Sequence, residues 1–191
     1  MSGLLPGFTD PVLDAQSAFR AVLEAMSRPG RIQRLQRPPA PPAPLSPASG
    51  AVLLTLADSG TPLFLDTGPD AEEWVRFHAG CPLVAEPAEA EFVLASALPP
   101  KLAALRAGTD EDPQTSATLI LQVESLEEGA GWHLTGPGIE HAHRLRVAGA
   151  PQGFVAEWAA NAVRFPRGVD VILCAGDTIA ALPRSVSIRE G

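Results

Sequence analysis

Apolar and polar residues follow one another along this chain with helical and strand periods that predict an α/β fold. Thr9-Asp10-Pro11 is a good helix start, because Asp10 can accept hydrogen bonds from first-turn amides and Pro11 suits the first helical position. Pro29-Gly30 should end this helix. Its apolar residues recur at helical spacing and predict one apolar face, formed by Val12, Ala15, Phe19, Val22, Leu23 and Met26.

Further helices and strands are expected along the rest of the chain. Helices are predicted from Ser46-Pro47 to Ala57, from Asp70 to Gly80, from Pro99 to Gly108, and over residues 154–165 before Pro166. Two nearly continuous apolar runs, 117–123 and 169–174, are typical of strands covered on both faces. Shorter strands are expected at 31–35, 61–65, 91–94 and 179–182, with a hairpin pairing 132–135 and 144–147.

This order of elements predicts three layers, with a central mixed β-sheet between helices. The 191 residues suffice for one well-packed domain, so a single domain over 1–191 is expected. Within it, the proline-rich residues 38–47 should form an extended surface connector. A stiff loop is favoured there over a docking motif for a proline-binding domain.

Composition limits the class of protein. No apolar stretch is long enough to span a membrane and no signal peptide is recognisable, so a cytoplasmic protein without a membrane partner is expected. Cys81 and Cys174 lie far apart in apolar surroundings and are interpreted as buried, reduced thiols rather than a disulfide or a nucleophile.

The charge of the chain further limits the ligands and partners that it could bind. A net charge of −8 disfavours nucleic acid as a partner but leaves room for a small anionic ligand held by a few arginines. Lys101 is the only lysine, so any mechanism that needs an active-site lysine depends on it.

Two segments could carry chemistry but have simpler interpretations. Gly136-Pro137-Gly138 lacks the sequence of a phosphate-binding loop, and a tight turn between strands is favoured. His141 and His143 could share a metal if extended, but only Glu140 lies nearby to complete a set, so a solvated loop without metal is favoured.

Charged residues at the ends of predicted elements are the candidate ligand-binding residues. A guanidinium fork suits a pair of phosphate or phosphonate oxygens, and ordinary caps and salt bridges are the competing interpretation. The candidates are Asp58, Arg76, His78, Arg167, Asp170 and Arg184. The sequence has no G-x-S-x-G, H-E-x-x-H or C-x-x-C motif, and no nucleophile with an obvious base. No catalytic residue can be assigned from the sequence. This absence favours a protein that functions as a subunit of a larger assembly.

Several separated blocks, spread in order over nearly the whole chain, resemble the PhnH family of the bacterial carbon–phosphorus lyase system. They are Phe19-Arg20, Met26-Ser27-Arg28-Pro29-Gly30, Leu53-Leu54-Thr55-Leu56-Ala57-Asp58 with Thr61-Pro62, Arg76-Phe77-His78, residues 117–123, Leu134-Thr135-Gly136-Pro137-Gly138-Ile139, Phe165-Pro166-Arg167-Gly168-Val169-Asp170, and Leu182-Pro183-Arg184.

The resemblance implies a fold like that of pyridoxal-phosphate-dependent transferases, without that cofactor. It also implies a homodimer and assembly with PhnG, PhnI, PhnJ and PhnL subunits. The resemblance further implies that, with PhnG, PhnI and PhnL, such a subunit supports the formation of ribose 1-alkylphosphonate 5-triphosphate from ATP and an alkylphosphonate, and that PhnJ later breaks the C–P bond. Three roles are then open: a structural subunit, a contributor of arginines to a shared phosphonate or nucleotide site, or an independent pyridoxal-phosphate transferase or lyase. Fold analogy alone suggests the third role.

Overall fold

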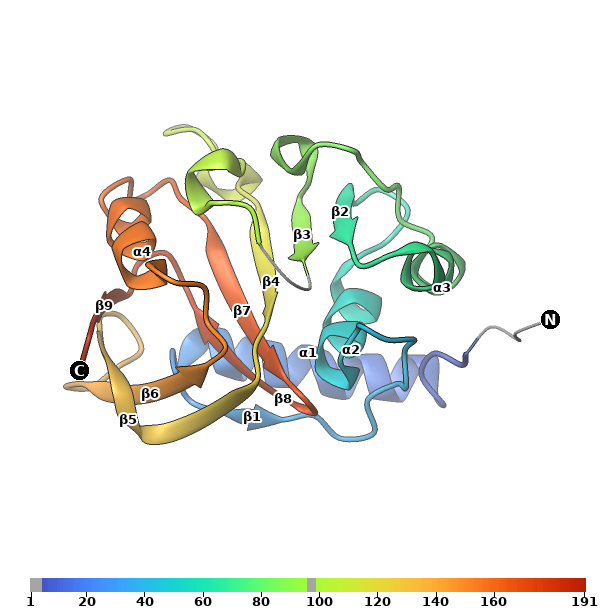
Figure 1. Ribbon diagram of the computed structural model, residues 1–191, viewed down its shortest axis with the longest axis horizontal. Coiled ribbons are helices and arrows are strands. Elements are labelled where there is room, and N and C mark those ends of the chain that lie inside the picture. Colours follow the sequence, from blue (N-terminus) through green and yellow to red (C-terminus); the bar gives the residue numbers. More distant parts are fainter. Residues whose placement is uncertain (1–4, 96–98) are drawn as a thin grey trace.

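A six-stranded mixed sheet forms the centre of the structure, a computed structural model that describes residues 5–95 and 99–191 (Figure 1). Its strand order is β1-β8-β7-β4-β3-β2, in which β2, β3, β4 and β7 are parallel and β1 and β8 are antiparallel to their neighbours. The strands are β1 (Gln33–Arg34), β2 (Leu63–Asp66), β3 (Phe92–Ala95), β4 (Thr118–Gln122), β7 (Asp170–Ala175) and β8 (Thr178–Leu182).

A second, antiparallel sheet has the order β6-β5-β9, with β5 (Ser125–Thr135), β6 (His143–Ala148) and β9 (Ser187–Arg189). The α-helices are α1 (Pro11–Ser27), α2 (Pro47–Leu56), α3 (Pro69–Ala79) and α4 (Phe154–Ala162). Three 3-10 turns, η1 (Pro87–Glu89), η2 (Leu102–Ala104) and η3 (Pro113–Thr115), lie in the connections. Among the described residues, no helix combines the length and apolar character needed to cross a membrane.

Alternate residues of the central strands face two separate cores. Ile120 and Ile172 face a core that includes residues of α1, α2 and α3, whereas Leu119 and Val171 face one shared with α4 and the second sheet. The prediction of strands buried on both faces is therefore confirmed for β4 and β7, and the prediction of a mixed α/β fold with a central mixed sheet is confirmed with it.

Helix α1 begins where the sequence predicts but buries a different face. Asp10 caps it, accepting hydrogen bonds from the amides of Val12 and Leu13. The predicted apolar face is wrong in part, because Val12, Phe19 and Leu23 are 76%, 44% and 52% exposed. The small residues Ala18 and Ala25 are buried instead, along with Asp14 and Val22. Small side chains let this face approach α2 and β8 closely.

The predicted helix over 99–108 is wrong, because only the single turn η2 forms there. Leu105 is extended, and the next two carbonyl groups bond to other segments: Arg106 accepts from the Ala117 amide and Ala107 from the Gly168 amide. The predicted helix over 154–165 ends earlier than expected. Helix α4 stops at Ala162, and Phe165 beyond it is 62% exposed.

The proline-rich segment 38–47 lies outside the helices and strands up to Pro47, the first residue of α2, and it is anchored to the central sheet. Gln122, at the end of β4, accepts hydrogen bonds from the Ser46 amide and the Ser49 hydroxyl and donates one to the Pro44 carbonyl. Ser46 caps α2, as predicted. The segment is thus a fixed strap, with Pro39 and Leu45 buried, more than a surface connector.

The Gly136-Pro137-Gly138 segment forms the predicted tight turn, in which the Ile139 amide donates to the Gly136 carbonyl. Gly138 has a φ of +82°, and a Cβ atom there would overlap the carbonyl oxygen of Ser27 at the end of α1. Two blocks of the family resemblance, about one hundred positions apart in the chain, therefore touch here through backbone atoms. His143 fastens the same junction, with its Nε2 atom 3.1 Å from the Gly30 carbonyl oxygen.

Both cysteines are buried free thiols, as predicted. Burial away from water raises the pKa of Cys81 and of Cys174, because it penalises the thiolate.

Candidate functional site

Two of the predicted site residues, Asp170 and Arg184, form a half-buried ion pair at the amino end of β7. The Arg184 Nε and backbone amide donate to Asp170 Oδ1 at 3.1 and 2.7 Å, and Nη2 contacts Oδ2. Nη1 donates to the Pro113 carbonyl at 2.7 Å. Both side chains are only 15% exposed. The guanidinium fork of Arg184 is therefore already occupied by groups of the chain itself.

Arg167 lies three positions before Asp170, at the same end of the sheet. Its Nε atom is 3.1 Å from the Asp110 carboxylate, and both side chains of this pair are largely accessible, at 42% and 72%. The three residues gather at the amino ends of the parallel strands. Ligands of open α/β sheets usually bind at the opposite, carboxyl ends. In this chain the carboxyl end of β4 is engaged by the strap, through Gln122.

Asp58 lies in the turn before β2, three strands away from β7. Its carboxylate accepts from the Gly60 amide and the Thr61 hydroxyl, each at 2.8 Å. These hydrogen bonds, the Gly60 amide foremost, lower the pKa of Asp58. Its observed contacts are those of a turn-stabilising residue.

Arg76 and His78 lie near the end of α3, apart from the other candidates. Arg76 forms an exposed pair with Glu72, with 3.7 Å between Nη2 and Oε2. His78 Nε2 is 3.0 Å from the Leu5 carbonyl oxygen, which also accepts from Trp74 Nε1 at 2.9 Å. His78 thus helps to fasten the N-terminal segment to α3. The structure brings together Arg167, Asp170 and Arg184, but neither Asp58 nor α3 joins them.

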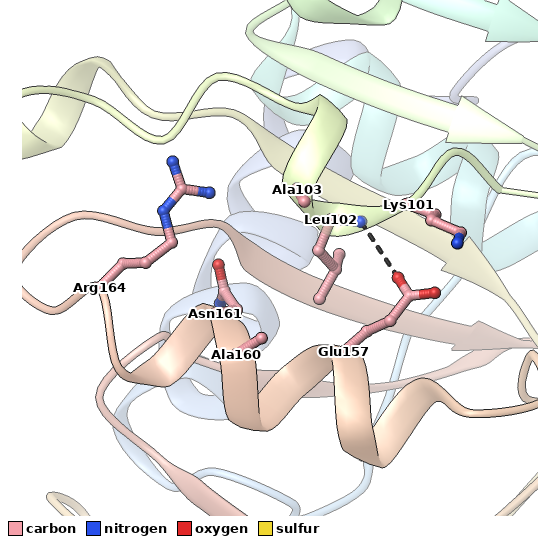
Figure 2. A pocket seen from close by; sticks show the side chains of 7 residues that line it. All are labelled: Lys101, Leu102, Ala103, Glu157, Ala160, Asn161 and Arg164. Carbon is pink, nitrogen blue, oxygen red and sulfur yellow. Dashed lines mark hydrogen bonds between the residues drawn. The ribbon is translucent and has the colours of Figure 1, made fainter.

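A pocket of about 150 Å³ lies between α4 and η2. Three of its residues come from α4 and a fourth from the turn just after that helix, while the other three are two residues of η2 and the position before it (Figure 2). We call it the α4 pocket. Its lining residues are Lys101, Leu102, Ala103, Glu157, Ala160, Asn161 and Arg164.

Buried hydrogen bonds fix the frame of the α4 pocket. Glu157 Oε2 accepts from the Leu102 amide at 3.2 Å, which ties η2 to α4 (Figure 2). Asn161 is 3% exposed. Its side-chain Nδ2 atom donates to the Val169 carbonyl at 2.9 Å, and its Oδ1 atom accepts from the Val169 backbone amide at 2.8 Å. Gly168 packs against Asn161, where a Cβ would lie 3.0 Å from Oδ1. The segment that Asn161 holds leads directly into Asp170, so pocket and ion pair share one rigid support.

The sequence predictions missed the pocket residues Glu157 and Arg164 and placed Lys101 within the helix expected from Pro99, which does not form. One signal was available, because positions 157, 160, 161 and 164 share a helical face carrying a carboxylate, an amide and a guanidinium beside alanine. His141 and His143 do not join either site. His141 is exposed beside Glu140, and among residues 5–95 and 99–191 no group of three or more potential metal ligands is found.

Comparison with known proteins identifies the family. Residues 6–189 match the family model described as bacterial phosphonate metabolism protein (PhnH). The chain is 40% identical over 187 residues to the alpha-D-ribose 1-methylphosphonate 5-triphosphate synthase subunit PhnH of Rhizobium meliloti (strain 1021), covering 95% of this chain and 94% of the relative. It is 36% identical over 177 residues to the putative C-P lyase subunit protein HtxG of Stutzerimonas stutzeri, covering 91% and 85%. The resemblance seen in the sequence blocks is confirmed: this chain belongs to the PhnH family.

Proposed function

We propose that this chain is a subunit of a carbon–phosphorus lyase assembly, needed to form ribose 1-alkylphosphonate 5-triphosphate from ATP and an alkylphosphonate. The observation that carries the proposal is the match, over almost the full length of both chains, to a relative named as a synthase subunit. The role we assign is mainly structural, because the charged candidate residues are engaged in caps and ion pairs within the chain.

The outer face of α1 supports a role in assembly. Val12, Leu13, Phe19 and Leu23 are four large apolar side chains exposed on one helix. Grouped apolar residues on a protein surface commonly mark protein–protein contacts. We propose that such surfaces serve a homodimer and contacts with PhnG, PhnI, PhnJ and PhnL-like subunits in the cytoplasm, with residues 1–191 acting as one domain.

The finer description of the fold is also part of this proposal. Four parallel strands next to the antiparallel β8, with α1, α2 and α3 on one face and α4 with the second sheet on the other, support kinship with pyridoxal-phosphate-dependent transferases that have lost the cofactor. Lys101, the only lysine available for a Schiff base, is solvent-exposed at the edge of the α4 pocket.

Reconstitution tests the proposed role. The chain is purified alone and together with the PhnG, PhnI and PhnL partners of the same organism, and adenine release from ATP plus methylphosphonate is measured. We expect turnover only in the complete mixture, and none when this chain is left out. Turnover by the isolated chain would overturn the structural role.

A second candidate function is a contribution of charged side chains to a site shared with a partner. Arg76 and Arg167 favour it, because their side chains are 62% and 42% exposed in surface pairs that a ligand could displace. Alanine substitutions at Arg76 and Arg167 should then lower turnover of complexes that still assemble. Normal turnover by such complexes would exclude this function.

A further inference from the structure

We propose that the α4 pocket binds a small organic monoanion, with a short apolar body and one terminal carboxylate group. This inference concerns the isolated chain and does not depend on its role as a subunit. It assigns a ligand to a site outside the six charged residues discussed above.

The size of the pocket sets the first limit on the ligand. Its volume of about 150 Å³ is below the roughly 300–1,000 Å³ of pockets that enclose drug-sized ligands. A nucleotide is too large for it. A molecule with a few carbon atoms and one ionised group is of suitable size.

The lining between the charged ends is apolar. Leu102, Ala103 and Ala160 form this part, and Leu102 is 2% exposed. An inorganic anion has no apolar part to bury against such a surface. A short alkyl chain gains about 0.8 kcal/mol for each methylene group that it buries. The lining therefore favours a ligand with an apolar body.

Two cationic side chains stand at opposite ends of the pocket, Lys101 and Arg164 (Figure 2). Within the part of the chain that the structure describes, neither forms an ion pair, whereas Arg76, Arg167 and Arg184 all do. Unpaired cations beside an apolar cavity attract an anion, and the attraction is strengthened where the ligand excludes water.

The charge of the lining selects among anions. Lys101 and Arg164 supply two positive charges and Glu157 one negative charge, which leaves a net charge of +1. The Glu157 carboxylate accepts a hydrogen bond from the Leu102 amide, which fixes its position in the pocket lining. One positive charge in excess balances a monoanion, while a dianion would bring its second charge close to the Glu157 carboxylate.

Three matched probes test the proposal by isothermal titration calorimetry with the full chain. Butyrate has the proposed apolar body and single negative charge, n-butylamine has the same body with a positive charge, and inorganic phosphate has no apolar body. We expect saturable binding of butyrate, with n-butylamine and phosphate each binding at least about tenfold more weakly. No saturable binding of butyrate, or equal binding of either comparison probe, would overturn the proposal.

Variants locate the binding in the pocket. Of Lys101→Gln and Arg164→Gln, the one that removes the cation nearer the carboxylate should weaken butyrate binding about tenfold, the loss of one charge-assisted contact, and the other should weaken it less. Ala160→Phe, on the exposed side of α4, should fill the pocket and abolish binding. Arg20→Gln is the matched control, because Arg20 is an exposed arginine on α1, which packs against the other core. Circular dichroism confirms that each variant is folded. Wild-type affinity in all three pocket variants would contradict the assignment.

Discussion

The ion pair of Asp170 with Arg184 and the α4 pocket share a support but use their charges in opposite ways. In the ion pair, the guanidinium donors and carboxylate acceptors are matched within the chain and shielded from solvent. In the pocket, Lys101 and Arg164 flank an apolar cavity, and among the described residues neither has an ionic partner. A satisfied charge contributes to stability, whereas an unsatisfied one beside a cavity is available to a ligand. The comparison predicts that substitutions in the ion pair lower the free energy of unfolding, whereas substitutions of the pocket cations lower ligand affinity.

The largest effect on stability is expected for Arg184→Ala. It leaves the Pro113 carbonyl without its donor, and it leaves the Asp170 carboxylate with only the backbone amide of residue 184, in a poorly solvated place. Breaking a buried pair by removing one partner costs about 3–5 kcal/mol, and the 15% exposure of both groups places the expected loss near the lower end. Urea unfolding followed by circular dichroism measures it. A loss below about 1 kcal/mol, the range of surface pairs, would contradict the structural role of this pair.

Asn161→Ala tests the support that the two regions share. The change removes both side-chain hydrogen bonds to Val169. The backbone amide and carbonyl of Val169 are then buried without these partners. We expect a loss of about 2–3 kcal/mol in the free energy of unfolding, because unsatisfied buried groups cost about 1–3 kcal/mol. The variant should also weaken butyrate binding, since Asn161 lines the pocket. A loss of stability comparable with that of Arg184→Ala and an unchanged affinity would show that the two regions are not coupled.

The pocket cations should have little influence on stability. Lys101→Gln and Arg164→Gln remove charges that have no ionic partner among residues 5–95 and 99–191. Each should therefore change the free energy of unfolding by less than about 0.5 kcal/mol, as surface substitutions usually do. The same urea series that includes Arg184→Ala provides the measurement. Destabilisation of more than about 1 kcal/mol would mean that these side chains belong to the frame.

The smallest effect, and one that depends on pH, is expected at Asp58. Its carboxylate accepts hydrogen bonds from Gly60 and Thr61 in an exposed turn, and these bonds lower its pKa below the ordinary aspartate value of 3.8. A lowered pKa in the folded state stabilises the fold above pH 3.8, and this contribution is lost as the pH falls through the folded value. Asp58→Asn should remove only this part of the acid dependence. The Asp58 carboxyl shift, followed by NMR, should titrate below 3.8 in the wild type; titration at or above that value would contradict the hydrogen-bonded turn.

Much of the fold follows from local signals in the sequence. Continuous apolar runs predict β4 and β7 because both faces of those strands are buried, and Ser46-Pro47 predicts the start of α2 because the cap is local. The burial of α1 and the loss of the helix after Pro99 could not be predicted in the same way. Both depend on partners distant in sequence, such as Ala117 and Gly168 for the carbonyls of 106 and 107.

The candidate site, too, could be predicted only where local sequence signals suffice. Asp170 and Arg184 could be recognised at the ends of elements, but their pairing depends on the register of β7 with β8, in which Val171 is opposite Leu182. A single sequence does not specify that register. The α4 pocket brings Lys101 next to a helix more than fifty positions later, through the Glu157 contact with the Leu102 amide. No local pattern contains that contact.

The strap over residues 38–47 has a practical consequence for engineered forms of this protein. Gln122 holds its C-terminal part through Pro44 and Ser46 and holds α2 through Ser49, so that an insertion there would detach the start of α2 from β4. Ala40 and Ala43 are exposed, lie before those anchors and belong to no helix or strand. A peptide tag or fluorophore attachment site belongs at Ala40, where it would report on assembly with partners while α2, β4 and both cores keep their contacts.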